Sequence, residues 1–393
     1  MKQSRRILLL TFYYEPDLCA GSFRATALME AFKDVLSKDD RVDVITTMPN
    51  RYQTFKVDAQ EYEQDGLINI YRIPLPTHQS GLTDQAKSFT KYFFRALAIT
   101  RGKQYDLVIA TSSRLFTAFL GSISSYRFRA PLYLDIRDIF IDTMNEVLTN
   151  RLLKAFIMPL LILVERFSFG RANHINLVSE GFKKYFKQRY QTKYSFFTNG
   201  IDQEFLDYDF SATIKNEKPI ITYAGNIGEG QGLHIIIPEV AKALEKEFQF
   251  KIIGDGGAKP KLVEELNRLD VKNVDLIKPV NREGLKKYYK ESDYLFLHLN
   301  AFKAFEKVLP SKIFEYAVTN KPIIGGVGGY AAKFLEKNVS NAIIFPPGDV
   351  DTFIEKMRNY ENQSFDVNSF IEKYSRKNVM KNMVNGIQES FLE

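Results

Sequence analysis

The sequence contains a single cysteine, Cys19, among its 393 residues. One cysteine excludes an intramolecular disulfide framework and a cysteine-rich zinc site. The four histidines show no metal-ligand spacing, so we expect no metal and no cofactor. The longest wholly apolar run, 155–164, is about half of a membrane span, and the N-terminus lacks a signal-peptide pattern. We therefore expect a reduced, cytoplasmic protein that does not span a membrane.

Several common binding motifs are also missing. No helix-turn-helix, RNP or zinc-finger pattern occurs, so we expect no nucleic-acid partner. The turn 254–257 follows a predicted strand, but Lys259 occupies the third glycine position of a dinucleotide fingerprint, which disfavours a nicotinamide or flavin enzyme. Asp349 and Asp351 form a short Asp-x-Asp, which we interpret as the start of a helix.

The residues that are present, 45% hydrophobic and 26% charged, are typical of a folded protein. Short apolar runs alternate with amphipathic helical stretches along the whole chain. The predicted strands are 7–12, 42–46, 68–73, 107–110, 132–136, 174–178, 220–224, 248–253, 294–299, 322–324 and 342–345. Continuous apolar strands separated by helices indicate parallel sheets that are covered on both faces. The predicted fold class is therefore α/β, with doubly wound, Rossmann-like domains.

The number of strands favours two such domains with a cleft between them. A polar stretch, 210–218, precedes a new strand and marks the expected boundary. We expect an N-terminal domain over 1–212, a C-terminal domain over 213–365, and one last helix over 366–393 that packs back across the domains. Ligands of such folds lie at the carboxyl ends of the strands, so the loops there are the candidate sites.

Positive charge is concentrated in the first half of the chain. Residues 1–200 carry 28 basic and 19 acidic residues, or +9, and residues 201–393 carry 26 and 28, or −2. Two basic segments, 85–129 and 150–193, also contain apolar residues at helical spacing. This pattern is typical of helices on an anionic membrane surface, although buried helices and a solvated basic face produce it as well.

Glycine-rich and charged loops are the strongest candidates for chemistry. The loop Gly225–Gly232 has four glycines in eight residues after a strand and ends at a helix start, which favours a diphosphate. At a second helix start, Lys312 can meet a phosphate and Glu315 can accept ribose hydroxyls. Arg137 and Asp138 follow a strand and should reach the cleft, unless they form only a salt-bridged loop pair.

Seven motifs together resemble one family. They are Tyr14-Glu15-Pro16 with Gly21-Ser22-x-Arg24, Ile136-Arg137-Asp138, Val178-Ser179-Glu180, Asn199-Gly200-Ile201-Asp202, Gly225-Asn226-Ile227-Gly228 with Gln231-Gly232-Leu233, Ile253-Gly254-Asp255-Gly256, and Leu309-Pro310-Ser311-Lys312-Ile313-Phe314-Glu315-Tyr316. In this order they resemble the family 4 retaining glycosyltransferases of bacterial surface-polysaccharide biosynthesis, which have the GT-B fold. N-acetyl-fucosamine-type transferases are the most similar members.

The resemblance implies roles for individual residues. The catalytic residues would be Arg137, Asp138 and Lys312, and the acceptor-binding residues Gly21, Ser22 and Arg24. The donor-binding residues would be Gly225, Asn226, Gly228, Gly232, Gly254, Asp255, Gly256, Ser311, Lys312 and Glu315. Glu315 would hold the ribose, and the turn around Gly254 would lie near the nucleobase.

Three positions in two motifs depart from the family pattern. The first glutamate of the family's Glu-x7-Glu motif falls on Lys307, with Glu306 one position away. Glu229 and Gln231 replace the basic residues that many members have in the phosphate loop.

The implied activity is transfer of a sugar, with retention, from a UDP-N-acetylhexosamine-like donor to a polyprenyl-diphosphate-linked saccharide. The expected location is the inner face of the cytoplasmic membrane. Two alternatives remain open, a UDP-sugar 2-epimerase of the same architecture and a non-catalytic nucleotide-sugar binding protein.

Overall fold

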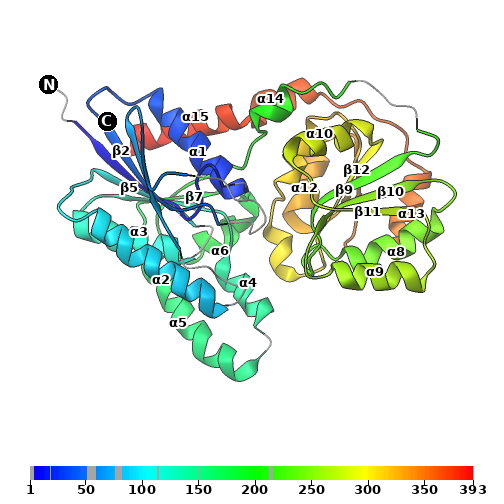
Figure 1. The fold of residues 1–393 in the computed structure, drawn as a ribbon, viewed down its shortest axis with the longest axis horizontal. Helices are drawn as coiled ribbons and strands as arrows, with labels where there is room; N and C mark the ends of the chain where they lie inside the picture. Colours follow the sequence, from blue (N-terminus) through cyan, green and yellow to red (C-terminus); the bar gives the residue numbers. More distant parts are fainter. Residues whose placement is uncertain are drawn as a thin grey trace. The chain divides into compact units, whose positions relative to one another are not determined.

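The structure is a computed structural model that describes residues 4–17, 19–50, 59–75, 82–112, 115–148, 150–211 and 216–392. The chain divides into two compact units. The first comprises residues 1–199 and 376–393, and the second comprises residues 200–375. Figure 1 shows the elements of both units along the chain.

The first domain is built on a sheet of eight strands in the order β3-β4-β2-β1-β5-β6-β7-β8. All neighbours pair in parallel except β3 and β4. Its elements are β1 (Arg6–Leu10), α1 (Ala20–Lys33), β2 (Arg41–Thr47), β3 (Tyr62–Asp65), β4 (Ile68–Ile73), α2 (Leu82–Ile99), β5 (Leu107–Ser112), α3 (Leu115–Phe128), β6 (Leu132–Ile136), α4 (Phe140–Val147), α5 (Arg151–Gly170), β7 (His174–Leu177), η1 (Glu180–Phe182), α6 (Lys183–Lys187), β8 (Lys193–Ser195) and α15 (Arg376–Phe391).

The second domain is built on a six-stranded parallel sheet in the order β11-β10-β9-β12-β13-β14. Its elements are α7 (Gln203–Leu206), β9 (Ile220–Asn226), α8 (Leu233–Ala243), β10 (Gln249–Asp255), α9 (Lys259–Arg268), β11 (Val274–Ile277), α10 (Arg282–Glu291), β12 (Tyr294–His298), η2 (Lys303–Lys307), α11 (Lys312–Ala317), β13 (Ile323–Gly326), α12 (Gly329–Asn338), β14 (Ala342–Phe345), α13 (Val350–Arg358) and α14 (Val367–Tyr374).

Helices cover both faces of each sheet. In the first domain, α1 and α15 pack together on one face, and α2, α3 and α5 lie on the other (Figure 1). In the second domain, α8, α9 and α13 share one apolar core, and α10, α11, α12 and α14 share the other. The predicted fold of two doubly wound α/β domains is therefore confirmed.

The domain limits differ from the expected ones. The expected boundary falls at residues outside the described part, whereas the two units divide at Asn199 and Gly200. Residues after Gly200 belong to the second unit because Ile201, Phe205 and Phe210 are buried in its core. The expected last helix over 366–393 is in fact two helices, separated by Ser375. As expected, the segment packs on both domains, with α14 in the second and α15 in the first.

The two apolar helical stretches of the first domain differ in whether their apolar side chains are buried or exposed. In α2, Phe89 and Tyr92 are buried, so this stretch is a core helix. In α5, most of the corresponding side chains are exposed, namely Leu152, Leu153, Phe156, Leu160, Leu163 and Phe167. Within the described residues, no helix combines the length and hydropathy that a membrane crossing requires.

Candidate active site

The strand order of the second sheet directs attention to one crevice. Strands β9 and β12 are neighbours, and the chain winds away from them in opposite directions, so their carboxyl ends form the topological switch point. Ligands of doubly wound sheets bind at this point. The loop Gly225–Gly232 begins in the last two residues of β9, and His298 is the last residue of β12, so the predicted glycine-rich loop lies at the expected position.

Hydrogen bonds hold this loop in one compact conformation. The side chain of Asn226 donates to Gln231 (2.9 Å), and the backbone N–H groups of Gln231 and Gly232 donate to the carbonyl of Gly228. Asn300 donates to the carbonyl of Gly230 through its backbone and to that of Glu229 through its side chain. The loop is therefore tied to the end of β12 before any ligand arrives.

The turn after β10 supports the loop through backbone contact. Gly254 pairs with Gly225, and a Cβ at Gly254 would lie 1.8 Å from the Gly225 carbonyl oxygen. A Cβ at Gly256 would lie 2.5 Å from the Ile227 carbonyl oxygen, and the N–H of Ile227 donates to the Asp255 carbonyl. Both glycines also have positive φ angles, which glycine adopts at little cost. This packing accounts for Gly254 and Gly256 without a nucleobase.

Lys312 lies directly over the first glycine of the loop. It opens α11 after Ser311, and a Cβ at Gly225 would lie 2.6 Å from the Cε and Nζ atoms of Lys312. Its Nζ atom makes no hydrogen bond or ion pair with the described residues and lies 5.9 Å from the centre of the Tyr223 ring. Burial lowers the pKa of Lys312, and the Glu315 carboxylate opposes this shift. Lys312 and the glycine-rich loop therefore lie side by side at the end of β9.

Glu315 lies one helical turn after Lys312 and is half-buried. Residues three apart on a helix share a face, so both side chains lie on the same side of α11.

Arg282 lies within the electrostatic influence of Glu315. It binds Asp202 at 2.7 Å and also contacts Glu204. Burial acts to lower the pKa of Arg282, but the charges of Asp202, Glu204 and Glu315 raise it overall.

His298 joins two loops and is not placed as a base. Its Nε2 atom accepts a hydrogen bond from the N–H of Gly348 (2.9 Å), so Nδ1 carries the proton and donates to the Gln231 carbonyl (2.5 Å). Burial lowers the pKa of His298 to about 4. The interpretation of His298 as a packed histidine is confirmed, and its role is to hold the glycine-rich loop.

This geometry predicts a pH-dependent stability. The folded pKa of His298 lies below the ordinary value of 6.5, so the unfolded chain binds the proton more tightly and stability falls as the pH falls from 6.5 to 4. A shift of this size corresponds to at most about 3 kcal/mol. We expect His298→Gln to flatten the dependence of unfolding free energy on pH in this window, as measured by urea denaturation. Equal slopes in the two proteins would contradict the role of His298.

A second glycine-rich turn was missed from the sequence. Residues Gly325–Gly329 run from the end of β13 to the start of α12 and contain four glycines in five positions. Gly329 has a φ of 57°, and a Cβ there would lie 2.1 Å from the carbonyl oxygen of Glu306. This turn therefore approaches η2, which carries exposed Glu306 and half-buried Lys307. The four glycines in five residues are the sequence signal that could have revealed this turn.

In the first domain, Gly21 and Arg137 are brought together. A Cβ at Gly21 would lie 2.3 Å from an Nη atom of Arg137, so the glycine leaves room for the guanidinium at the start of α1. Burial lowers the pKa of Arg137, and the neighbouring Asp138 carboxylate opposes this shift. Asp138 is exposed. These residues form a charged group at the carboxyl end of β6, as the sequence predicted.

Arg24 and Ser22 are not available to an acceptor, which corrects their predicted role. Arg24 is 1% exposed and binds Asp135 through two hydrogen bonds of 2.7 and 2.9 Å. It also donates to the carbonyls of Phe197 and Thr198. Ser22 is fully buried in α1. Arg24 therefore joins α1, β6 and the end of the first domain as a structural residue.

Two further points concern metal ligands. Within the described ranges, no three His, Cys, Asp or Glu side chains are grouped closely enough to hold a metal ion. Asp349 accepts a hydrogen bond from the N–H of Thr352 at 3.0 Å, which confirms that it starts α13.

Comparison with protein families identifies the second domain. The family model described as "Glycosyl transferases group 1" matches residues 205–378. This match covers nearly the whole second domain. The match includes the glycine-rich loop, Lys312, Glu315 and the turn Gly325–Gly329, so the family pattern contains the whole crevice described above.

Individual proteins and solved structures match more of the chain than the family model does. A protein of Escherichia coli K12, provisionally named as the colanic acid biosynthesis glycosyl transferase WcaI, is 26% identical over 82% of each chain. Sucrose-phosphate synthase from Thermosynechococcus elongatus matches with a TM-score of 0.74 at 12% identity over 99% of this chain and 100% of its own. Anabaena HepE, solved with UDP and glucose, matches with a TM-score of 0.64 at 14% identity over 99% and 100%. The fold is GT-B.

Proposed function

We propose that this protein is a family 4 retaining hexosyltransferase that transfers a sugar from a UDP-linked donor to a lipid-linked saccharide. The observation that carries the proposal is the position of Lys312, whose Nζ atom lies over Gly225 at the start of the glycine-rich loop. A lysine and backbone N–H groups at the switch point suit a diphosphate. The bound UDP in Anabaena HepE supports UDP as the nucleotide.

The difficult step is departure of the diphosphate. The bond between the sugar carbon and the β-phosphate oxygen breaks, and the oxygen keeps the electron pair. The acceptor hydroxyl oxygen forms a new bond to the same carbon, and its proton passes to the departing diphosphate. Preorganised positive groups stabilise such developing charge strongly. Lys312 and the N–H groups of the loop and of the first turn of α8 would do so here. Because His298 and Asn300 fix the loop in advance, little reorganisation is needed.

The acceptor would bind in the first domain, where Gly21, Arg137 and Asp138 lie together. We propose a polyprenyl-diphosphate-linked saccharide in surface-polysaccharide assembly, which is consistent with the named process of the Escherichia coli relative. Such an acceptor would place the enzyme at the inner face of the cytoplasmic membrane. The excess of positive charge in residues 1–200 suits an anionic surface.

The test is incubation with UDP-sugars and a polyprenyl-diphosphate saccharide, with and without EDTA. We expect transfer with retained anomeric configuration that survives chelation. Loss of transfer in EDTA, restored by a divalent ion, would overturn the metal-independent step. Conversion of a UDP-N-acetylhexosamine to its 2-epimer without acceptor would instead identify an epimerase, and donor binding without any turnover would identify a binding protein.

Glu315 supplies a second prediction. If its carboxylate accepts the ribose hydroxyls, Glu315→Ala should weaken UDP binding by about 1–3 kcal/mol, the usual range for charge-assisted hydrogen bonds. Calorimetry with UDP and with 2′,3′-dideoxy-UDP measures this directly. The wild-type protein should distinguish the two nucleotides and the variant should not. Glu336→Ala, at an exposed position of α12, is the matched control. Unchanged discrimination in Glu315→Ala would refute the ribose assignment.

A further inference from the structure

Helix α5 presents apolar side chains to solvent. Five large residues at intervals of three or four form a continuous outward stripe, which we call the α5 stripe: Leu152, Phe156, Leu160, Leu163 and Phe167. Phe156 is 81% exposed and Leu152 is 75% exposed. Such a contiguous apolar surface is typical of a site that another molecule covers.

The inward side of the same helix carries polar groups. Glu165 is 3% exposed and accepts hydrogen bonds from the hydroxyls of Tyr185 (2.7 Å) and Tyr190 (2.8 Å). Ser168 is fully buried and donates to the carbonyl of Val164. An ordinary surface helix faces its apolar side to the core. Helix α5 buries Leu161 and Phe169 beside these polar groups, whereas the α5 stripe faces solvent, so the stripe does not belong to the core of its own domain.

Positive charges accompany the stripe. Arg151, Lys154 and Arg166 lie on α5, and Arg171 directly follows it. No ion pair within the described residues neutralises any of these four. The outer surface of α5 therefore combines apolar side chains with unneutralised positive charge.

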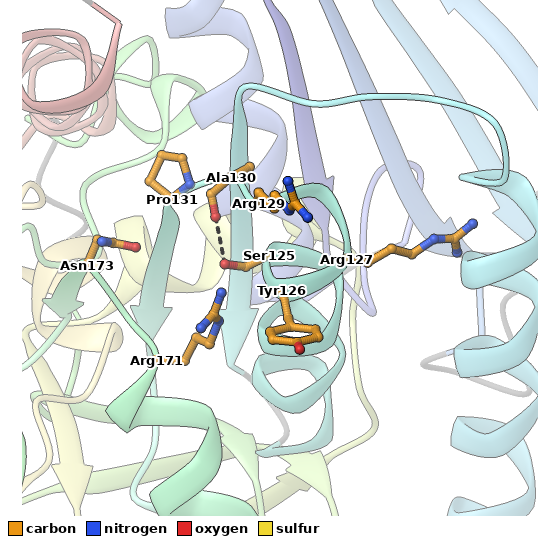
Figure 2. Close-up of a pocket in the computed structure, with 8 residues that line it drawn as sticks. All are labelled: Ser125, Tyr126, Arg127, Arg129, Ala130, Pro131, Arg171 and Asn173. Carbon is orange, nitrogen blue, oxygen red and sulfur yellow. Dashed lines mark hydrogen bonds between the residues drawn. The ribbon is translucent and has the colours of Figure 1, made fainter.

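A basic hollow of about 690 Å³ lies at the C-terminal end of α5. It is lined by Ser125, Tyr126, Arg127, Arg129, Ala130, Pro131, Arg171 and Asn173, without a carboxylate. In Figure 2, Arg171 lies beside the ring of Tyr126, at 5.1 Å from its centre, and Arg127 points away from the other side chains. Arg129 and Arg171 are two of the three arginines that line the hollow.

We propose that α5 lies in the headgroup region of an anionic bilayer, with the α5 stripe among the acyl chains and the hollow at its end holding a lipid phosphate. Basic residues beside an apolar face characterise interfacial helices. A second copy of this chain fits poorly, because pairing two α5 stripes would bring the same positive charges together. The inference deepens the proposed function and rests on it, since a lipid-linked acceptor places the enzyme at a bilayer.

The position of α5 suits an enzyme with such an acceptor. Only α4 separates Arg137 and Asp138 from the start of α5, so the stripe begins on the acceptor side of the first domain. The hollow lies at the other end of the helix, where Pro131 and Asn173 precede β6 and β7. The helix would therefore be held to the lipid along its whole length.

Flotation with phosphatidylglycerol and phosphatidylcholine vesicles tests the surface. We expect the wild-type protein to bind the anionic vesicles, and the variant Phe156→Gln, Leu160→Gln, Leu163→Gln to bind at least tenfold more weakly. Glutamine keeps a helix propensity close to that of leucine. Val263→Gln, on exposed α9 of the second domain, is the control. Unchanged binding by the triple variant would overturn the proposal and would point to a protein partner for the stripe.

Insertion can be observed directly because the sequence contains no tryptophan. Phe156→Trp would supply a single fluorophore on the stripe, and Tyr62→Trp would supply one on exposed strand β3. On anionic vesicles, we expect a blue shift and quenching by brominated lipid only for Trp introduced at residue 156. Equal responses at both positions would contradict insertion of α5.

The hollow is tested separately with Arg129→Gln, Arg171→Gln. A control that removes the same charge elsewhere in the first domain is Lys377→Gln, Lys381→Gln on exposed positions of α15. We expect the arginine variant to bind anionic vesicles at least threefold more weakly than the lysine control. Equal binding would show that the hollow holds no lipid phosphate.

Turnover separates this inference from the proposed function. The stripe variant should transfer sugar to a short-chain, water-soluble acceptor at the wild-type rate and lose activity only towards acceptor embedded in vesicles. Equal activity of the variant and the wild type on embedded acceptor would overturn the inference alone. Absence of turnover by the wild-type protein on either acceptor, with vesicle binding intact, would overturn the proposed function alone.

Discussion

Replacing Arg24 by methionine should destabilise the first domain by about 3–5 kcal/mol, the usual cost of leaving one member of a buried ion pair without its partner. Arg24 and Asp135 are both about 1% exposed, and their two hydrogen bonds link α1 to β6. Methionine fills similar space but leaves the Asp135 carboxylate buried and uncompensated. Urea denaturation, followed by circular dichroism, measures the loss.

The double variant Arg24→Met, Asp135→Leu is the matched control. Replacing a whole buried ion pair by apolar residues is often close to neutral, so the double variant should recover most of the loss. The two sites are in contact, and their effects should therefore be strongly non-additive. A stable Arg24→Met protein that loses only acceptor affinity would show that Arg24 binds the acceptor after all.

Replacing Lys312 by methionine should lower the rate of sugar transfer by about 10²–10³-fold, the range found when one preorganised donor to a developing negative charge is removed. The fold should survive, because the Nζ atom makes no hydrogen bond or ion pair with the described residues and the methionine side chain can occupy the space over Gly225. Single-turnover transfer and UDP titration separate the chemical step from binding.

Lys278→Met, at an exposed position of the same domain, is the control and should behave as the wild type. We expect Lys312→Met to lose more in the chemical step than in UDP affinity, since charge on the diphosphate grows as the sugar leaves. A rate within threefold of the wild type would show that Lys312 does not act on the leaving group.

Much of the architecture could be predicted because buried parallel strands appear in the sequence as short apolar runs. Strands missed by this criterion are short or lie near the edge of a sheet, such as β3, whose four residues are exposed. The end of the second domain could not be predicted, since no proline or glycine marks the break between α14 and α15. A backbone bridge between Ile201 and Ser375 accompanies that break, and sequence spacing does not reveal such a contact.

The candidate site was predictable where a backbone requirement selects a recognisable residue in the sequence. Glycines at Gly225 and Gly232 and the helix start at Lys312 are visible as patterns, and the structure brings Gly225 and Lys312 together. Contacts between residues that are distant in the sequence produce no recognisable sequence pattern. Arg24 binds Asp135, 111 residues away, so a sequence motif alone could not distinguish a structural arginine from an acceptor-binding one.

A crystal structure of the protein with bound UDP tests most directly how the second domain holds its donor. We predict the diphosphate at the carboxyl ends of β9 and β12, with one oxygen within hydrogen-bond distance of Lys312 Nζ and another facing the N–H groups of Gly225–Gly232. The Glu315 carboxylate should contact the ribose hydroxyls. Density for the diphosphate away from this loop, with Lys312 turned into another contact, would contradict the account.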